Sequence, residues 1–384
     1  MFEERYQSEI GPIELPRKGV PSGVVGENAA LEVRAAVSDA GALEAVDDEL
    51  KRLLDIGAGG WTEANRAWIR AQAEAFAGSW AALDRARQMP RCDFELDLRA
   101  ISLGEEKEDN LIPYLRLARL ARVVAAEAEG RGDVSVACAS ARRLLTAARC
   151  LSTGPLEIYR MIGHSVERSG LVIVHGSVAR FSSREASDVS VDVTTLAQLP
   201  DHVALRHGDS MAFYLGGIER VGLAWVPDDL VRAIWLRCEL QFAVLERSDL
   251  DAARDLASSI HASKDPRDAV CKKFSDSRLE LAILDALMQR ARRITLAALS
   301  VRKAVEPIEA QEVASWRPVL RLPDEGVQLD RLPDGSTVVS DPGLARLARE
   351  FTTAKVPASF ETLSEWRVPP ADPVREPPDH EGAL

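Results

Sequence analysis

Apolar residues recur at spacings of three and four along most of the chain, which is the pattern of a helix with one buried face. Gly130, Gly132 and Asp133 interrupt this pattern with a helix stop and a helix N-cap. The sequence therefore predicts an antiparallel helix hairpin around them. Its two facing stripes are Leu117, Leu120 and Val124, then Ala137, Ala141 and Leu144.

The same spacing predicts helices through most of the remaining chain, as far as residue 306. The pattern after Asp249 repeats that after Asp133, but no period of about 34 residues joins the two copies, so a regular solenoid is not predicted. We expect a mainly α fold: an irregular array of antiparallel helix hairpins, similar in style to tetratricopeptide repeats. The expected helices cover 39–56, 62–90, 155–181, 184–199, 201–223, 228–247, 249–263 and 268–304.

The character of the chain changes after Pro307. Residues 327–331 and 337–340 have strand composition, and Pro333-Asp334-Gly335 supplies the turn of a β-hairpin. We expect this small β-containing appendix, residues 307–368, to contribute little to the stability of the helices. The predicted organisation is an extended lead-in over 1–28, a helical domain over 29–306, the appendix, and a disordered tail over 369–384.

The charge of the chain argues against nucleic-acid and membrane partners. Lys and Arg number 48 against 60 Asp and Glu, for a net charge of -12, which repels phosphate backbones and anionic bilayers. Residues 142–184 carry seven arginines against only Glu157 and Glu167, which indicates solvated helix faces or, alternatively, a site for an acidic partner. The first residues lack a signal-peptide pattern, and no apolar run is long enough to span a bilayer, so the chain as written is expected to be soluble and cytoplasmic.

Five widely spaced cysteines form no Cys-x-x-Cys pair, and most of them are expected to be small core residues. The glycine-rich GAGGW at 57–61 lacks the lysine and the strand of a phosphate-binding loop. No cofactor is therefore predicted.

Gly163-His164-Ser165 raises the question of a hydrolase nucleophile. A nucleophile elbow needs a strand before the serine and a small residue two positions after it, but here Glu167 follows in a helical pattern. Helical spacing places His164 on a polar face with Arg160 and Arg168, so its replacement is expected to change stability little. Ser165 is assigned to the opposite, packed face.

A second candidate is DHVALRHGDS at 201–210. Asp201, His202, His207 and Asp209 are residue types that bind zinc or manganese, but their spacing matches no ligand motif. An N-cap at Asp201 and a helix kink or cap at 208–210 explain the segment better than a metal site does. No metal and no catalytic residue is therefore assigned from the sequence.

Several segments resemble a family of uncharacterised helical proteins that are abundant in planctomycete-type bacteria. The segments are GENAALEVRAA, MPRCDFELD, PYLRLARLARVVAAEAEGRGDVSVACASARRLL, and ARRITLAALSVRKA leading to LRLPDEGVQLDRLPDGSTVVSDPG. Members of that family generally carry an N-terminal membrane anchor and a pseudopilin-like C-terminal element. The present sequence shows no such anchor and has LPDEGVQL in place of the usual Asp-Pro form. The resemblance implies no catalytic residue.

Taken together, these features predict a non-enzymatic helical scaffold that binds a protein partner. The alternative is a hydrolase or metal-dependent enzyme whose site assembles only in space, with the His207–Asp209 region or Ser165 as its best candidates. Clustering of His, Asp and Ser side chains in one pocket would favour the enzyme.

Overall fold

The computed structural model describes residues 27–94, 96, 101–102, 109–154, 156–198, 248–265, 268–303, 326–351 and 359–369, together with separate positions between 234 and 245. The predicted helix over 201–223 lies outside the described residues. So do the lead-in up to residue 26, the tail from residue 370 and the candidate ligands Asp201, His202, His207 and Asp209.

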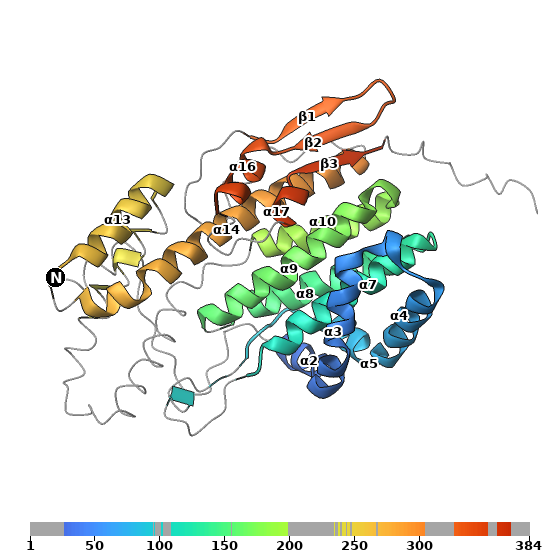
Figure 1. Cartoon of the computed structure of the whole chain (residues 1–384), viewed down its shortest axis with the longest axis horizontal. Coiled ribbons are helices and arrows are strands. Elements are labelled where there is room, and N and C mark those ends of the chain that lie inside the picture. The colour runs from blue at the N-terminus through green and yellow to red at the C-terminus, as the bar shows by residue number, and fades with distance from the viewer. Residues whose placement is uncertain are drawn as a thin grey trace, which may run out of the picture.

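The described part of the chain is mainly helical, which confirms the predicted fold class (Figure 1). Two short 3₁₀ turns, η1 (Ala58–Gly60) and η2 (Val178–Arg180), join longer helices. The helices before the C-terminal element are α2 (Ala29–Ala35), α3 (Ala40–Ile56), α4 (Glu63–Ala75), α5 (Ala77–Ala86), α7 (Ile112–Gly130), α8 (Val134–Ser152), α9 (Glu157–Ser177), α10 (Ser183–Ala197), α13 (Leu250–Ala262) and α14 (Ala269–Arg302).

The predicted hairpin is formed by α7 and α8. Gly132 has a φ of 80°, and the Asp133 amide donates to the Ala128 carbonyl oxygen at 2.9 Å. The Asp133 carboxylate accepts from the Val136 amide at 3.4 Å and caps α8. This cap satisfies one of the amides that a helix N-terminus leaves without a partner. The two predicted stripes are buried against each other.

Helix α9 packs closely against α8 because glycines face that helix. A Cβ atom on Gly163 would lie 2.9 Å from the Ser152 hydroxyl, and one on Gly170 would lie 3.3 Å from the Ala141 carbonyl oxygen. Helices α7, α8 and α9 form the centre of the array, with α3, α4 and α5 on one side and α10 and α14 on the other (Figure 1).

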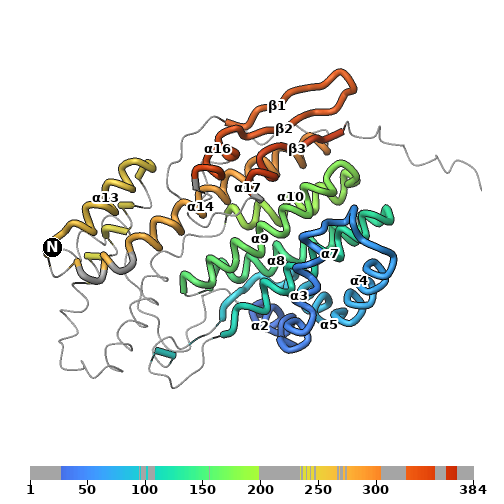
Figure 2. Tube along the Cα trace, viewed as in Figure 1, coloured from blue at the N-terminus to red at the C-terminus, as the bar shows by residue number. Residues whose placement is uncertain are grey.

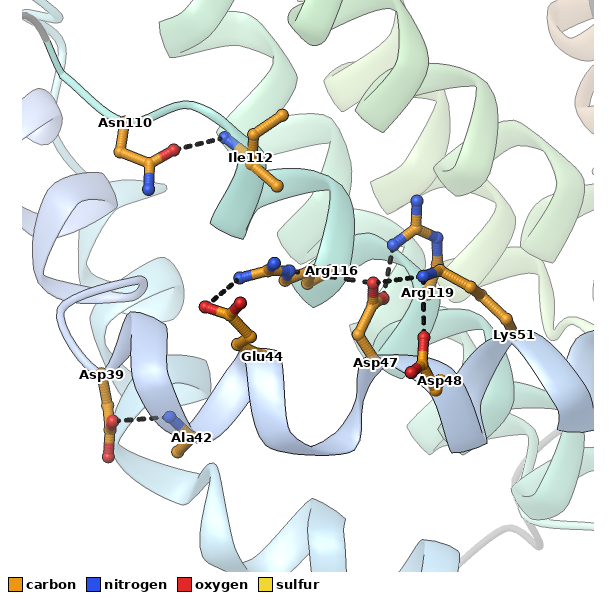
Figure 3. Close-up of polar contacts among 10 residues, drawn as sticks. All are labelled: Asp39, Ala42, Glu44, Asp47, Asp48, Lys51, Asn110, Ile112, Arg116 and Arg119. Carbon is orange, nitrogen blue, oxygen red and sulfur yellow. Dashed lines mark hydrogen bonds and ion pairs between the residues drawn. The ribbon is translucent and has the colours of Figure 1, made fainter.

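Helices α3 and α7 are joined by a network of ion pairs around Asp47, which is buried (Figure 3). Lys51 Nζ lies 2.9 Å from Asp47 Oδ2, Arg116 lies between Glu44 and Asp47, and Arg119 donates to Asp47 Oδ1. Burial opposes ionisation, yet the hydrogen bonds from Lys51 and Arg119 hold the pKa of Asp47 below its usual value. The cationic groups of this interface are therefore matched by carboxylates.

The C-terminal element is larger than the predicted hairpin. Strands β1 (Gln328–Arg331) and β2 (Thr337–Ser340) pair antiparallel as expected, and β3 (Glu365–Val368) extends the sheet on the other side of β2. Two further helices, α16 (Pro342–Phe351) and α17 (Ser359–Thr362), lie between β2 and β3 in sequence. β3 was not predicted, because EWRV is a short segment with no turn signal linking it to the hairpin.

This element packs against the helices and shares their core. Figure 2 traces α14 from α13 at one end to the sheet at the other, and α14 contacts β2, β3 and α16. Trp366, Phe360 and Val339 are almost completely buried in the main core cluster. Arg290 of α14 donates to Asp341 from Nε at 3.0 Å, and neither residue is exposed. The expectation that this element contributes little to the helices does not agree with this packing.

Candidate functional site

Ser165 lies in the middle of α9, which confirms that no strand leads into it. Its hydroxyl donates to the Met161 carbonyl oxygen at 3.1 Å, as hydroxyls inside helices commonly do. Ser165 is half-buried rather than packed in the core. Its backbone lacks the strand-to-helix turn that exposes a catalytic serine.

The predicted assignment of the two faces of α9 is wrong. His164 is fully buried and Arg160 is nearly so, whereas Ile158 and Met161 are exposed. The reason is that α14 offers charged side chains to the polar face, and pairing with them makes burial of the polar residues possible. Periodicity identified two faces but could not show which one met a partner helix.

The buried face of α9 forms a charged network with α14. Arg160 Nε donates to Asp285 at 2.8 Å, and His164 Nε2 also contacts that carboxylate. Arg292 donates to both oxygens of Glu167, at 2.6 and 2.7 Å. Burial alone would raise the pKa of Glu167, but Arg292 and then His164 lower it to about 2. These side chains are buried and contact one another, so the network fixes the position of α14 on α9.

A signal for this network was present in the sequence of α14. Asp285, Gln289 and Arg292 follow helical spacing within a long helix that is also rich in apolar residues. Polar side chains that become buried when such a helix packs must find polar partners. Asp285 and Arg292 are thus structural residues that the sequence analysis did not single out.

One Ser-His-Asp set does occur among the described residues, between α13 and α14. Ser275 Oγ lies 3.1 Å from His261 Nε2, and Asp276 Oδ1 lies 2.9 Å from the same nitrogen. A catalytic relay needs the carboxylate on Nδ1 and the serine on Nε2, so that the ring passes a proton between them. With both groups on Nε2, and with His261 and Asp276 exposed to solvent, this set does not provide that relay.

Within the described ranges, no three His, Cys, Asp or Glu side chains are placed to hold a metal ion. In the same part of the chain, no helix combines the length and the apolar character needed to cross a bilayer.

Four of the five cysteines form disulfides, whereas most were expected to be small core residues without a covalent partner. Cys92 forms a disulfide with Cys150, and Cys238 forms one with Cys271. Cys138 is the remaining cysteine; it is buried, and burial raises its pKa to about 12. Spacing alone did not indicate these pairs, because the partners are 58 and 33 residues apart.

Most arginines of the arginine-rich stretch are used inside the fold. Arg142 pairs with Asp188 and Asp192, and Arg143 pairs with Asp84. Arg149 donates to the carbonyl oxygens of Ala86 and Met89, and Arg180 donates to that of Glu129. This stretch is therefore not a continuous free basic patch.

Three large apolar side chains are exposed near the starts of α7 and α9. Ile112 in the first turn of α7 is 49% exposed, and Ile158 and Met161 near the start of α9 are 40% and 44% exposed. The Tyr159 hydroxyl donates to Asp109 at 2.8 Å, which brings these two helix ends together. We call Ile112, Ile158 and Met161 the α7–α9 apolar surface.

Comparisons with known proteins give no relative: no protein-family model, curated protein or solved structure matches this chain.

Proposed function

We propose that this protein is a non-enzymatic helical scaffold that binds a protein partner on the α7–α9 apolar surface. The observation that carries the proposal is the exposure of Ile158 and Met161 on a helix whose opposite face is completely buried. Large apolar side chains gathered on one surface are typical of interaction sites, whereas single exposed ones are ordinary.

The burial and the hydrogen bonds of the polar side chains support a scaffold rather than the alternative, an enzyme. His164, Asp285 and Glu167 are enclosed in ion pairs, and the hydroxyl of Ser165 is bonded to its own helix. The exposed His261 lacks the geometry of a proton relay. The available side chains of the described part therefore favour binding over group transfer.

The two disulfides favour folding in an oxidising compartment, in place of the cytoplasm expected from the sequence. Disulfides form and persist outside the reducing cytosol in most organisms. A location beyond the cytoplasm also agrees with the membrane-anchored family that the sequence resembles. The partner would then be a protein of the same compartment.

The proposal is tested by binding assays with the tagged products of neighbouring genes. The double variant Ile158→Glu/Met161→Glu places charges on the proposed surface, and both positions are exposed enough to accept them without unfolding the chain. A matched control is Leu329→Glu, because Leu329 is 44% exposed on β1 in the C-terminal sheet. A partner that binds the wild type and Leu329→Glu but not the double variant supports the proposal. Equal binding to all three proteins would refute the assignment of the surface.

A further inference from the structure

Strand β1 forms one edge of the C-terminal sheet, and all of its residues are exposed. Figure 1 shows it at the outer margin of the molecule, beyond β2. The opposite edge of the sheet meets the helices, since the Glu365 carbonyl oxygen of β3 accepts a hydrogen bond from His175 Nε2 of α9 at 2.8 Å. Among the described residues, β1 therefore provides the open edge of the sheet.

The turn of the hairpin determines which backbone groups of β1 point outward. The Leu332 amide donates to the Ser336 carbonyl oxygen at 2.8 Å, so these two residues form a hydrogen-bonded pair. Hydrogen-bonded and non-hydrogen-bonded pairs alternate along an antiparallel ladder. Leu329, which lies opposite Val339, and Arg331 are therefore in non-hydrogen-bonded pairs. Their N–H and C=O groups point away from β2, toward the open edge.

The side chain of Leu329 continues an apolar row of the sheet. Directly paired residues share a face, so Leu329, Val339 and Trp366 lie in one row across the three strands. Val339 and Trp366 are almost completely buried in the main core, whereas Leu329 is 44% exposed. The core-facing row thus ends in an apolar side chain that is only partly covered. A strand added beside β1 would cover this side chain and bond the outward backbone groups.

We propose that β1 is a self-association surface, on which a second copy of this chain adds its own β1 antiparallel, about a twofold axis at Leu329. A twofold contact uses the same surface on both copies. In this register Leu329 lies beside its counterpart, so the apolar row runs without a break through both sheets. Gln328 lies opposite Asp330 of the second copy, and its amide donates to that carboxylate.

The charges of β1 argue against the other twofold registers. An axis at Asp330 would place two carboxylates opposite each other, and an axis at Arg331 would do the same with two guanidinium groups. An axis at Gln328 would leave Asp330 and Arg331 opposite residues outside the strand. Charged residues on edge strands commonly block unwanted pairing. Here they leave the register centred on Leu329 as the favourable one.

Sedimentation equilibrium of the full chain over a range of concentrations tests the self-association. Because β1 is short, the wild type should form a reversible dimer whose fraction rises with concentration. Leu329→Glu should weaken the dimer at least about ten-fold, because two carboxylates would meet at the axis. The control Val191→Glu adds the same charge at a position of α10 that is 61% exposed, and it should dimerise like the wild type.

Engineered cysteines test the register, and they also serve if the charged variant does not fold. Leu329→Cys should form an intermolecular disulfide in oxidised glutathione, because the Cα atoms of a hydrogen-bonded pair lie about 5.5 Å apart. In the same register the two Cα atoms at position 330 lie about 8 Å apart, which is too far for a disulfide without backbone movement. Asp330→Cys should therefore give little crosslinked dimer on non-reducing electrophoresis.

A wild type that stays monomeric would overturn the proposal, whether β1 is then free or pairs with a strand of another protein. So would a dimer that a folded Leu329→Glu chain leaves unchanged, or crosslinking of Asp330→Cys equal to that of Leu329→Cys. The α7–α9 apolar surface does not depend on this result. A monomeric Leu329→Glu chain should still bind the partner proposed above, so the two proposals fail separately.

Discussion

Arg292 of α14 donates two hydrogen bonds to Glu167 of α9, at 2.6 and 2.7 Å, and neither side chain is exposed to solvent. The two residues are 125 positions apart in the chain. A bidentate pair of this kind fixes direction as well as distance. It therefore determines how the long helix α14 lies on the central helices.

Glu167→Gln should destabilise the fold by about 3–5 kcal/mol at pH 7, because it leaves the Arg292 charge buried without its carboxylate. The pH dependence follows from the lowered pKa of Glu167, about 2 in the folded protein against about 4.3 in an unfolded chain. The stabilisation is complete above pH 4.3 and is lost as the pH falls toward 2. Urea unfolding of the wild type and of Glu167→Gln between pH 3 and pH 7 measures the free energy of unfolding of each protein. The wild type should be the more stable of the two at pH 7, and its advantage should decrease as the pH falls to 3.

A surface pair provides the control for this prediction. Glu49 and Arg52 are paired on α3, but both are largely exposed. Glu49→Gln should change the free energy of unfolding by about 0.5 kcal/mol or less. If Glu167→Gln behaved like Glu49→Gln, the buried network would not be holding α14 in place.

His164→Ala should lower the free energy of unfolding by at least about 2 kcal/mol, the opposite of what the sequence pattern predicts. The substitution opens a cavity in a fully buried site and removes a polar partner of Asp285. Thermal melts checked by circular dichroism test this. The neighbouring Ser165→Ala is the matched control and should change stability little, because Ser165 is half-buried and bonds only its own helix.

The two residues His164 and Asp133 show what the sequence could and could not determine. Asp133 was predicted correctly because a helix cap depends on residues within a few positions. His164 was misplaced because the burial of its face depends on Asp285, which lies 121 residues away. The β1–β2 hairpin could also be predicted, because its turn and its two strands are neighbours in the sequence. The pairing of β3 with β2 joins distant segments, so no local pattern indicated it.

The exposed apolar side chains of α9 follow the same rule, because periodicity did not show which face of that helix would meet α14. The disulfides were likewise beyond a spacing argument, because helix packing brings Cys92 to Cys150. The tertiary arrangement, rather than any motif, supplies each of these features.

Replacing Cys92 and Cys150 together by serine should lower the free energy of unfolding by about 2–4 kcal/mol. The disulfide closes a loop of 58 residues, so its loss gives the unfolded chain more conformational freedom. Chemical denaturation of the oxidised wild type and the variant measures the change. Mass spectrometry after thiol alkylation should find one free thiol, that of Cys138, in the unreduced protein. Alkylation of five thiols without reductant would show that neither bond forms.

Ending the chain at residue 303 should destabilise the helices, although the sequence pattern favoured a dispensable C-terminal element. The deletion removes Asp341 and with it the buried ion pair that joins the C-terminal element to Arg290 of α14. It also removes Trp366 and Phe360 from the shared core, which exposes the apolar surface of α14 that they cover. A lower melting temperature and a less cooperative circular dichroism melt are the expected results. The control ends at residue 369, which keeps the sheet, and it should melt like the full chain. A chain ending at residue 303 that melts at the wild-type temperature would instead support the independent appendix inferred from the sequence.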